Sequence, residues 1–518
     1  MSQSQQVNVT PEAQKDESSR FIQTTLKIIN SIEVVGNKLP HPVWIFVFLS
    51  AVVIALSAIM NAMGVSVINP SNGELSEVKT LLSREGMQVM LGDVVENYAK
   101  FPPLATILIT MLGIAVAEAS GLIDAVLRGT VSRVKPRYIT FAVSYAGMIG
   151  HVAGDAAYVT LIPLGALTFR AVGRSPVLGA IVAFVSISAG YDASPVLTTT
   201  DVLLSGISTA AAHTIDPEAF ISPTANYFFG LVSSIVISLT ITLVVERVLT
   251  KRQDLDVDEE SPEDDHDIKM GVDPHEVRGL KAAGIASIVF FGLLAAALIP
   301  ASSPFRGAED SILKSPVMTG MAGVIGLYFT TVGYVYGKRA GTFKTPTDII
   351  PAMAKGLSSM GPILVLFFFV SQFLAYFKWT GISAVLAVNG AELLESWAIP
   401  AWAMMLGLAV LLSLMNLIIT SGSAMWALVA PVFIPMLMLL GITPEETQAL
   451  YRVADSVTNC VTPMSPYFVM ALGFIQKYRK SAGIGTLASF TIPIAMTVWV
   501  VWMTLFTLWF IAGIPFGF

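Results

Sequence analysis

Polar residues interrupt the apolar stretch from Leu411 to Phe474 at two places. The first is Thr420-Ser421-Gly422-Ser423, which divides residues 400–440 into two apolar arms. We expect arms of about ten to fifteen residues, each too short to cross a hydrocarbon core of about 30 Å. The second interruption lies within residues 445–474 and contains Asp455, Asn459 and Pro463. Backbone breaks and ionisable groups at membrane depth are tolerated only inside protein or around a cavity. The sequence therefore predicts a re-entrant hairpin followed by a broken span, a pattern typical of secondary transporters.

The composition indicates a polytopic membrane protein whose main partner is the lipid bilayer. Of 518 residues, 54% are hydrophobic and 13% are charged, whereas a typical soluble domain has about 25% charged residues. The single cysteine, Cys460, excludes an intrachain disulfide and a cysteine-cluster metal site. Residues 1–20 are polar, so no cleavable signal peptide is expected. Lys and Arg are spread among short loops, which argues against a nucleic-acid partner.

The order of apolar segments predicts an all-α membrane protein built from an inverted repeat. Residues 1–40 are expected to be a cytoplasmic tail with an amphipathic helix over 21–38, lying on the membrane surface or packed on the protein. The first repeat, 41–248, is expected to contain spans 42–63 and 103–127, hairpin 138–169, broken span 177–212 and span 226–248. The second repeat, 316–513, is expected to contain spans 317–336 and 349–377, hairpin 400–440, broken span 445–474 and span 485–511.

Two segments between the repeats complete the expected organisation. Residues 249–279 form an acidic cytoplasmic linker, and residues 280–315 supply a linking span and its loop. With both hairpins returning to their side of entry, most basic residues fall on one side of the membrane. The positive-inside rule then places the N-terminus in the cytoplasm.

The hairpin tip at Ser421, Gly422 and Ser423 is the first candidate for substrate binding. A broken helix presents backbone N–H groups that suit a carboxylate, and hydroxyl groups add donors. Trp426 is placed to stack on an aromatic substrate. The alternative is a tight Gly/Ser turn followed by a tryptophan that only packs.

Asp455 is the first candidate for ion or proton coupling, with Asn459 and Pro463 in the same break as substrate contacts. A carboxylate within the membrane is costly, so it is expected to carry a proton or to pair with a cation. The alternative is a surface ion pair with Arg452, one helical turn earlier.

Two further clusters lie in the first repeat. Asp192, Ser194 and Asp201 accompany the break at 190–195, where two carboxylates suggest a proton or sodium relay, unless one of them only caps a helix. His151 and Asp155 occupy the tip of the first hairpin and suggest proton coupling, unless Asp155 is a helix cap. One His and one Asp are too few to indicate a metal site. No hydrolase or ATP-binding motif is present, so we expect neither an enzyme nor an ATP-driven pump.

Specific motifs resemble those of the p-aminobenzoyl-glutamate transporter (AbgT) family. They are SGSAMWALVAPVFIPMLMLLG, YRVADSVTNCVTPMSPYF, LATILITMLGIAVAEASGLI, AAYVTLIPLGAL and TTTDVLLSGIS, and the resemblance extends from about Pro40 to Gly513. It implies nine transmembrane helices plus two re-entrant helical hairpins, in a homodimer of the bacterial inner membrane. By position, the family's functional residues fall on Asp201, Ser423, Trp426, Pro444, Arg452, Asp455, Asn459 and Pro463. The resemblance therefore gives Arg452 a role in coupling.

These observations predict a secondary active transporter for a small aromatic carboxylate. The resemblance implies uptake of p-aminobenzoyl-glutamate, a folate breakdown product, by an elevator-type mechanism coupled to a proton or sodium gradient. Its alternative is proton-driven efflux of sulfonamide antimetabolite drugs. No cofactor is expected beyond a bound sodium ion as one of the two coupling alternatives. A passive channel and a membrane enzyme are the other classes, and the interrupted helices disfavour the first.

Overall fold

The computed structural model describes residues 40–68, 75–132, 134–252, 258, 271–307, 310–312 and 315–518. The expected tail and amphipathic helix before residue 40, and most of the acidic linker, lie outside these residues. The described chain is mostly helical. Its one sheet is an antiparallel ribbon of two short strands, β1 (Ser66–Ile68) and β2 (Leu75–Glu77), with Val67 opposite Ser76. The all-α expectation did not include this ribbon.

The helices follow one another along the chain with short connections. In the first half they are α2 (Pro42–Ala62), α3 (Arg84–Met87), η1 (Gln88–Gly92), α4 (Val94–Ala99), α5 (Pro102–Ala119), α6 (Leu122–Ser132), η2 (Pro136–Tyr138), α7 (Ile139–Gly150), η3 (His151–Ala153), α8 (Ala156–Ala171), α9 (Pro176–Ala189), α10 (Thr199–Ala212), α11 (Tyr227–Arg247) and η4 (Leu249–Lys251). In the second half they are α12 (Pro274–Leu298), α13 (Pro316–Thr319), α14 (Met321–Ala340), η7 (Pro346–Asp348), α15 (Ile349–Ser359), α16 (Gly361–Trp379), α17 (Ile382–Ser396), α18 (Ala401–Asn416), α19 (Gly422–Leu439), α20 (Pro444–Thr458), α21 (Pro466–Gln476) and α22 (Ile484–Ile511).

Several of these helices can cross a membrane. Among the described residues, seven are long and apolar enough by length and composition, namely α2, α5, α11 with η4, α12, α16, α19 and α22. Helices α17 and α18 meet the same test together, with a bend of 119° between them. A helix of about 20 apolar residues spans the hydrocarbon core. The protein is therefore a multi-pass membrane protein, while the expected total of nine spans and two hairpins stays a prediction.

The interruptions seen in the sequence are breaks between helices. Residues 138–169 hold α7 and α8 with η3 at their junction, and residues 177–212 hold α9 and α10 separated by nine residues without helix. Residues 445–474 hold most of α20 and α21. Gly154 has a φ of +53° at the first junction, a conformation that favours glycine over residues with a side chain. Pro466 begins α21, where a missing N–H costs no helical hydrogen bond.

Two expectations about continuity are wrong. Residues 103–127 and 349–377 were expected to be unbroken spans, but each forms two helices. Gly121, with a φ of +82°, separates α5 from α6, and Met360 separates α15 from α16, which has Pro362 in its first turn. The arms of the 400–440 hairpin are also longer than expected, with 16 residues in α18 and 18 in α19. Two prolines lie inside α19 without ending it.

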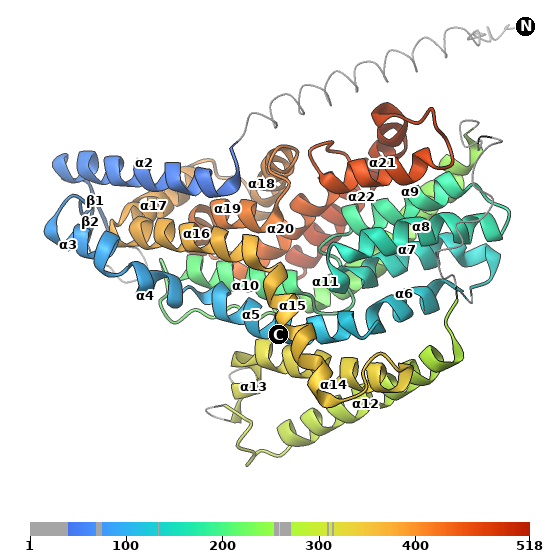
Figure 1. The fold of residues 1–518 in the computed structure, drawn as a ribbon. Helices are drawn as coiled ribbons and strands as arrows, with labels where there is room; N and C mark the ends of the chain where they lie inside the picture. The colour runs from blue at the N-terminus through green and yellow to red at the C-terminus, as the bar shows by residue number, and fades with distance from the viewer. Residues whose placement is uncertain are drawn as a thin grey trace, which may run out of the picture.

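The broken helices occupy the middle of the molecule. In Figure 1, α2, α16 and α17 lie towards one end and α7, α8 and α9 towards the other, with α10 and α20 between them. Helices α12 and α14 pack together along one side, and α14 also packs on α5. Helix α10 contacts α5, α19 and α20. This arrangement brings the chain breaks of both halves to one central region.

Helices α5 and α14 approach so closely that their contact requires glycine. A Cβ added to Gly113 of α5 would lie 1.9 Å from the carbonyl oxygen of Gly326 in α14. Small residues allow helix backbones in membranes to pack at short distance. Because backbone is the obstacle, no side-chain rotation can relieve this clash.

We expect Gly113→Ala to lower the free energy of unfolding by about 1–3 kcal/mol, the usual cost of overpacking. The measurement is the thermal denaturation midpoint of the purified protein in detergent. Gly323→Ala is the matched control, since a Cβ at Gly323 of α14 would meet nothing within 4 Å. Equal midpoints for the two variants would show that the helices are not in close contact.

Candidate substrate site between the broken helices

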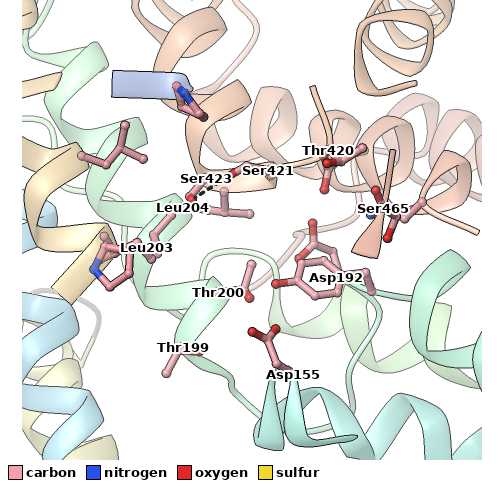
Figure 2. A pocket seen from close by; sticks show the side chains of 18 of the residues that line it. Asp155, Asp192, Thr199, Thr200, Leu203, Leu204, Thr420, Ser421, Ser423 and Ser465 are labelled. Atoms are coloured by element: carbon pink, nitrogen blue, oxygen red, sulfur yellow. Dashed lines mark hydrogen bonds between the residues drawn. The ribbon is translucent and has the colours of Figure 1, made fainter. Parts of the chain in front are cut away.

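A cavity of about 460 Å³ lies where the helix breaks meet. Its lining residues come from five breaks, and they include Asp155, Tyr191, Asp192, Met360, Pro362, Ser421, Gly422, Ser423, Asn459 and Ser465. Figure 2 shows that side chains from several of these breaks face the same space. Residues distant in sequence therefore form one site of a size that suits a small organic molecule.

The hairpin tip lies at the N-terminus of α19. Ser421 precedes the helix, and its hydroxyl oxygen lies 3.5 Å from that of Ser423. The first N–H groups of a helix have no intrahelical acceptor and carry the positive end of the helix dipole. The tip is therefore suited to bind a carboxylate. Asn416, at the end of α18, donates to Thr458 Oγ1 at 2.8 Å and to Asn459 Oδ1 at 3.0 Å, which ties the hairpin to α20.

Asp455 lies directly behind this tip. It is 1% exposed, and the Tyr451 hydroxyl lies 3.1 Å from its Oδ1 and 2.6 Å from the carbonyl oxygen of Gly422. Arg452 is 3% exposed and pairs with a different residue. The alternative of a surface ion pair between Asp455 and Arg452 is therefore wrong, because both residues point into the protein.

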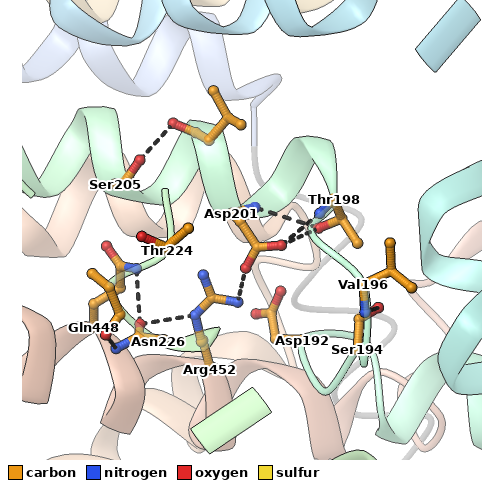
Figure 3. Close-up of polar contacts among 12 residues, drawn as sticks. Asp192, Ser194, Val196, Thr198, Asp201, Ser205, Thr224, Asn226, Gln448 and Arg452 are labelled. Atoms are coloured by element: carbon orange, nitrogen blue, oxygen red, sulfur yellow. Dashed lines mark hydrogen bonds and ion pairs between the residues drawn. The ribbon is translucent and has the colours of Figure 1, made fainter. Parts of the chain in front are cut away.

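Arg452 forms a buried ion pair with Asp201. Its Nη1 lies 2.8 Å from Asp201 Oδ1 (Figure 3). The other oxygen, Oδ2, accepts hydrogen bonds from the backbone N–H of Thr198 at 2.7 Å and from its hydroxyl at 2.8 Å. Asp201 therefore both caps α10 and balances the charge of Arg452. The residue pattern alone did not identify this pair, whereas the family resemblance pointed to both members.

A chain of hydrogen bonds extends from Arg452 towards α19. The Nε of Arg452 and the Nε2 of Gln448 donate to Oδ1 of Asn226, at 3.0 Å and 2.8 Å (Figure 3). Ser208 donates to Oε1 of Gln448 at 2.6 Å and accepts from the indole N–H of Trp426 at 3.1 Å. Sequence reasoning missed the first three partners. Gln448 lies four residues before Arg452, so helical spacing places both on one face of α20.

Asp192 has an unusual environment for a buried carboxylate. It lines the cavity and is 4% exposed. Among the described residues, neither of its carboxylate oxygens has a hydrogen-bond partner. Its backbone N–H donates to Ser456 Oγ at 3.1 Å, which connects the break before α10 to α20. Ser194 lies further along the same break, and its hydroxyl accepts from the backbone N–H of Val196 at 3.2 Å instead of lining the cavity.

The structure separates His151 from Asp155. The buried His151 has its Nε2 2.9 Å from the carbonyl oxygen of Ile187, and its ring lies edge-on to Tyr191. Asp155 lines the cavity at the start of α8, but its side chain makes no capping hydrogen bond. Neither the expected His–Asp pair nor the alternative side-chain cap is therefore present.

Trp426 and Pro463 do not line the cavity. Trp426 is fully buried behind the hairpin tip, with its ring centroid 4.4 Å from that of Tyr451. The expected stacking of Trp426 on a substrate ring is therefore wrong in this structure. Tyrosines supply the aromatic lining instead, and Tyr158 and Tyr467 stack on each other at 4.0 Å with an interplanar angle of 5°. These tyrosines lie in or beside expected breaks, which is the signal that could have identified them.

We expect Trp426→Phe to lower the free energy of unfolding by about 1 kcal/mol, because it removes the hydrogen bond to Ser208. The apparent KM for substrate should stay close to that of the parent protein, since the side chain does not reach the cavity. Thermal denaturation and initial transport rates test these two effects separately. A large increase in KM at an unchanged thermal midpoint would contradict this assignment.

The described residues contain no group of three or more His, Cys, Asp or Glu side chains arranged to hold a metal ion. The site is built from hydroxyl groups, carboxylates, phenols and a helix N-terminus. It is suited to noncovalent binding of a small polar molecule with an aromatic part.

Comparison with known proteins gives consistent matches over most of the chain. The family model described as "AbgT putative transporter family" matches residues 27–518. The p-aminobenzoyl-glutamate transport protein of Escherichia coli (strain K12) is 35% identical over 492 residues, covering 95% of this chain and 96% of that protein.

Two solved structures are also similar. The YdaH transporter of Alcanivorax borkumensis superposes with a TM-score of 0.86 at 37% identity, covering 92% of this chain and 100% of that one. MtrF of Neisseria gonorrhoeae, described with a class of antimetabolite efflux pumps, has a TM-score of 0.87 at 35% identity, covering 93% and 97%.

Proposed function

This chain belongs to the AbgT putative transporter family, and we propose that it carries p-aminobenzoyl-glutamate across the bacterial inner membrane as a secondary active transporter. The name of the E. coli relative supports this choice of substrate. The central cavity is the observation that carries the proposal, because it joins the hairpin tip, the aromatic lining and buried carboxylates in one space.

The parts of the cavity correspond to the parts of the substrate. The N-terminus of α19, with Ser421 and Ser423, binds a carboxylate of the glutamate half. The tyrosine lining contacts the aminobenzoyl ring, for which Tyr191 and Tyr467 offer partly exposed side chains. Asn459 adds an amide to the polar wall.

A proton or sodium gradient drives the transport, with Asp455 and the Asp201–Arg452 pair as the coupling groups. The helices around the breaks move together against α2, α5 and α16 in an elevator-type motion. This motion is supported by the contact of α10 and α19 with each other and of α10 with α5. We place the working protein in the membrane as a homodimer with a cytoplasmic N-terminus.

Export of sulfonamide antimetabolites is the second candidate function. The description of MtrF favours it, because that structure is similar over 93% of this chain. A sulfonamide drug resembles the aminobenzoyl half of the first substrate, so one cavity can accept both. The direction of transport then follows the gradient to which the carrier is coupled.

The test is uptake of labelled p-aminobenzoyl-glutamate into proteoliposomes under an imposed proton gradient and then a sodium gradient. We expect accumulation above equilibrium in one of them, and its loss in Asp455→Asn. Asp216→Asn is the matched control, because Asp216 is exposed in the loop after α10. Wild-type accumulation in Asp455→Asn would remove the coupling role. Sulfonamide extrusion without transport of p-aminobenzoyl-glutamate would favour the second function.

A further inference from the structure

We propose that Asp192 binds the coupling cation, a proton or an alkali cation, and that this cation must be bound before an anionic substrate enters the cavity. The ordering rests on the function proposed above, whereas cation binding to Asp192 does not. The residue pattern had placed Asp192 among the substrate contacts. The structure instead points to a positive ligand, for three reasons that concern its side chain, its neighbours and the charge of the cavity.

The first reason is the unsatisfied side chain. Asp192 is 4% exposed, and both carboxylate oxygens lack a hydrogen-bond partner among the described residues. Buried polar groups in native proteins almost always have partners, and exceptions usually mark a missing ligand, ion or water. The oxygens border the cavity, so such a ligand can reach them from the substrate space. An uncompensated buried charge is unfavourable, and a bound cation removes that cost.

The second reason is that the nearby protein cation is already engaged. Arg452 lies close enough to influence Asp192 electrostatically, but its guanidinium contacts Asp201 at 2.8 Å and Asn226 at 3.0 Å. No ion pair joins Arg452 to Asp192 within the described part of the chain. The charge of Asp201 is balanced, and that of Asp192 is not. Of the two carboxylates flanking this break, Asp192 is therefore the one free to take up a cation.

The other titratable neighbours supply no positive charge. Asp455 and Tyr451 approach Asp192 from α20, and Tyr191 is its neighbour in the break. His151 is directed to the carbonyl oxygen of Ile187. Asp155 faces the cavity from the first hairpin. Apart from Arg452, the surroundings are therefore neutral phenols and further carboxylates.

The third reason is the charge of the whole cavity. Asp155, Asp192 and Asp455 all line it, and no Lys or Arg is among its described lining residues; His41, at the rim, is its one basic side chain. A substrate that carries carboxylates would enter against three negative groups, and like charges repel strongly where water is excluded. A cation at Asp192 lowers this repulsion. Cation binding and anion binding must therefore favour each other, which is the requirement for coupling.

The experiment uses purified full-length protein without substrate, so that it does not depend on the proposed function. Thermal midpoints are measured in sodium chloride and in choline chloride, and across a pH series. A ligand that binds only the folded protein raises its midpoint. If the cation is sodium, the parent midpoint rises with sodium and that of Asp192→Asn does not. If it is a proton, the parent loses stability relative to Asp192→Asn as the pH rises, with no effect of sodium.

Three comparisons make the result decisive. Asp192→Glu retains the charge and should keep the response, whereas Asp216→Asn makes the same chemical change at an exposed site and should respond like the parent. Size-exclusion profiles identify variants that fail to fold. The proposal is overturned if Asp192→Asn responds to sodium and pH as the parent does, or if the parent responds to neither.

Transport then tests the ordering. In proteoliposomes, the apparent affinity for p-aminobenzoyl-glutamate should depend on the cation in the parent and become independent of it in Asp192→Asn. An unchanged dependence in this variant would overturn the ordering. Absence of any transport by the parent would count against the proposed function and leave the cation site standing on its thermal data.

Discussion

Replacing Arg452 by glutamine is expected to lower the free energy of unfolding by about 3 kcal/mol, at the lower end of the range for breaking a buried ion pair from one side. Glutamine can still donate towards Asn226, but it leaves the carboxylate of Asp201 without its cation. The side chain of Asp201 is 13% exposed and keeps its two hydrogen bonds from Thr198, which moderates the cost. Because the pair joins α10 to α20 beside the cavity, transport should be lost as well.

A double-mutant cycle separates the ion pair from other effects. Asp201→Asn combined with Arg452→Gln removes both charges, so we expect the double variant to be more stable than Arg452→Gln alone. Arg84→Gln is the control, because Arg84 lies exposed in α3. Thermal denaturation and proteoliposome uptake are the measurements. Additive losses in the double variant would mean that the two side chains do not stabilise one another.

Replacing Gly422 by alanine is expected to reduce the transport rate about ten- to a hundredfold. The new Cβ would lie 2.9 Å from Oδ2 of Asp455, and Tyr451 holds that carboxylate from the other side. Overpacking costs about 1–3 kcal/mol, and each 1.4 kcal/mol corresponds to a factor of about ten in rate. The methyl group would displace either the hairpin tip or the carboxylate, and both belong to the proposed site.

Gly407→Ala is the matched control for this substitution. Gly407 lies inside α18, the other arm of the same hairpin, and a Cβ there would meet nothing within 4 Å. Alanine is favoured over glycine in a helix by about 1 kcal/mol, so this variant should be slightly more stable and transport normally. Initial uptake rates at matched protein density provide the comparison. Equal rates for the two variants would exclude a tight contact between the hairpin tip and Asp455.

Hydropathy and breaker residues were sufficient to predict most of the architecture. The breaks at 190–198, 417–421 and 459–465 all coincide with polar, glycine or proline clusters in apolar runs. The unexpected breaks at Gly121 and Met360 follow less visible signals, since a single Gly or Gly-Pro step is common in membrane helices. The length of α19 was underestimated because tertiary packing tolerates proline inside a membrane helix.

Partners were harder to predict than positions. The sequence marked Asp192, Asp201 and Asp455 as costly carboxylates, but it could not show which cation each one faces. Arg452 turned out to reach across to α10, a contact separated by about 250 residues of chain, and no local spacing rule anticipates it. The orientation of Trp426 was unpredictable for the same reason, since burial on one helix face depends on what packs there.

Cys460 follows α20 at the edge of the central break, and its thiol is fully buried beside the Val457 carbonyl oxygen. It is the only cysteine among the 518 residues. A maleimide applied to the folded protein therefore finds no native thiol to modify. Single cysteines introduced at chosen helices can accept fluorophores or spin labels without first mutating the natural sequence, so distances between labelled helices can be followed during the transport cycle.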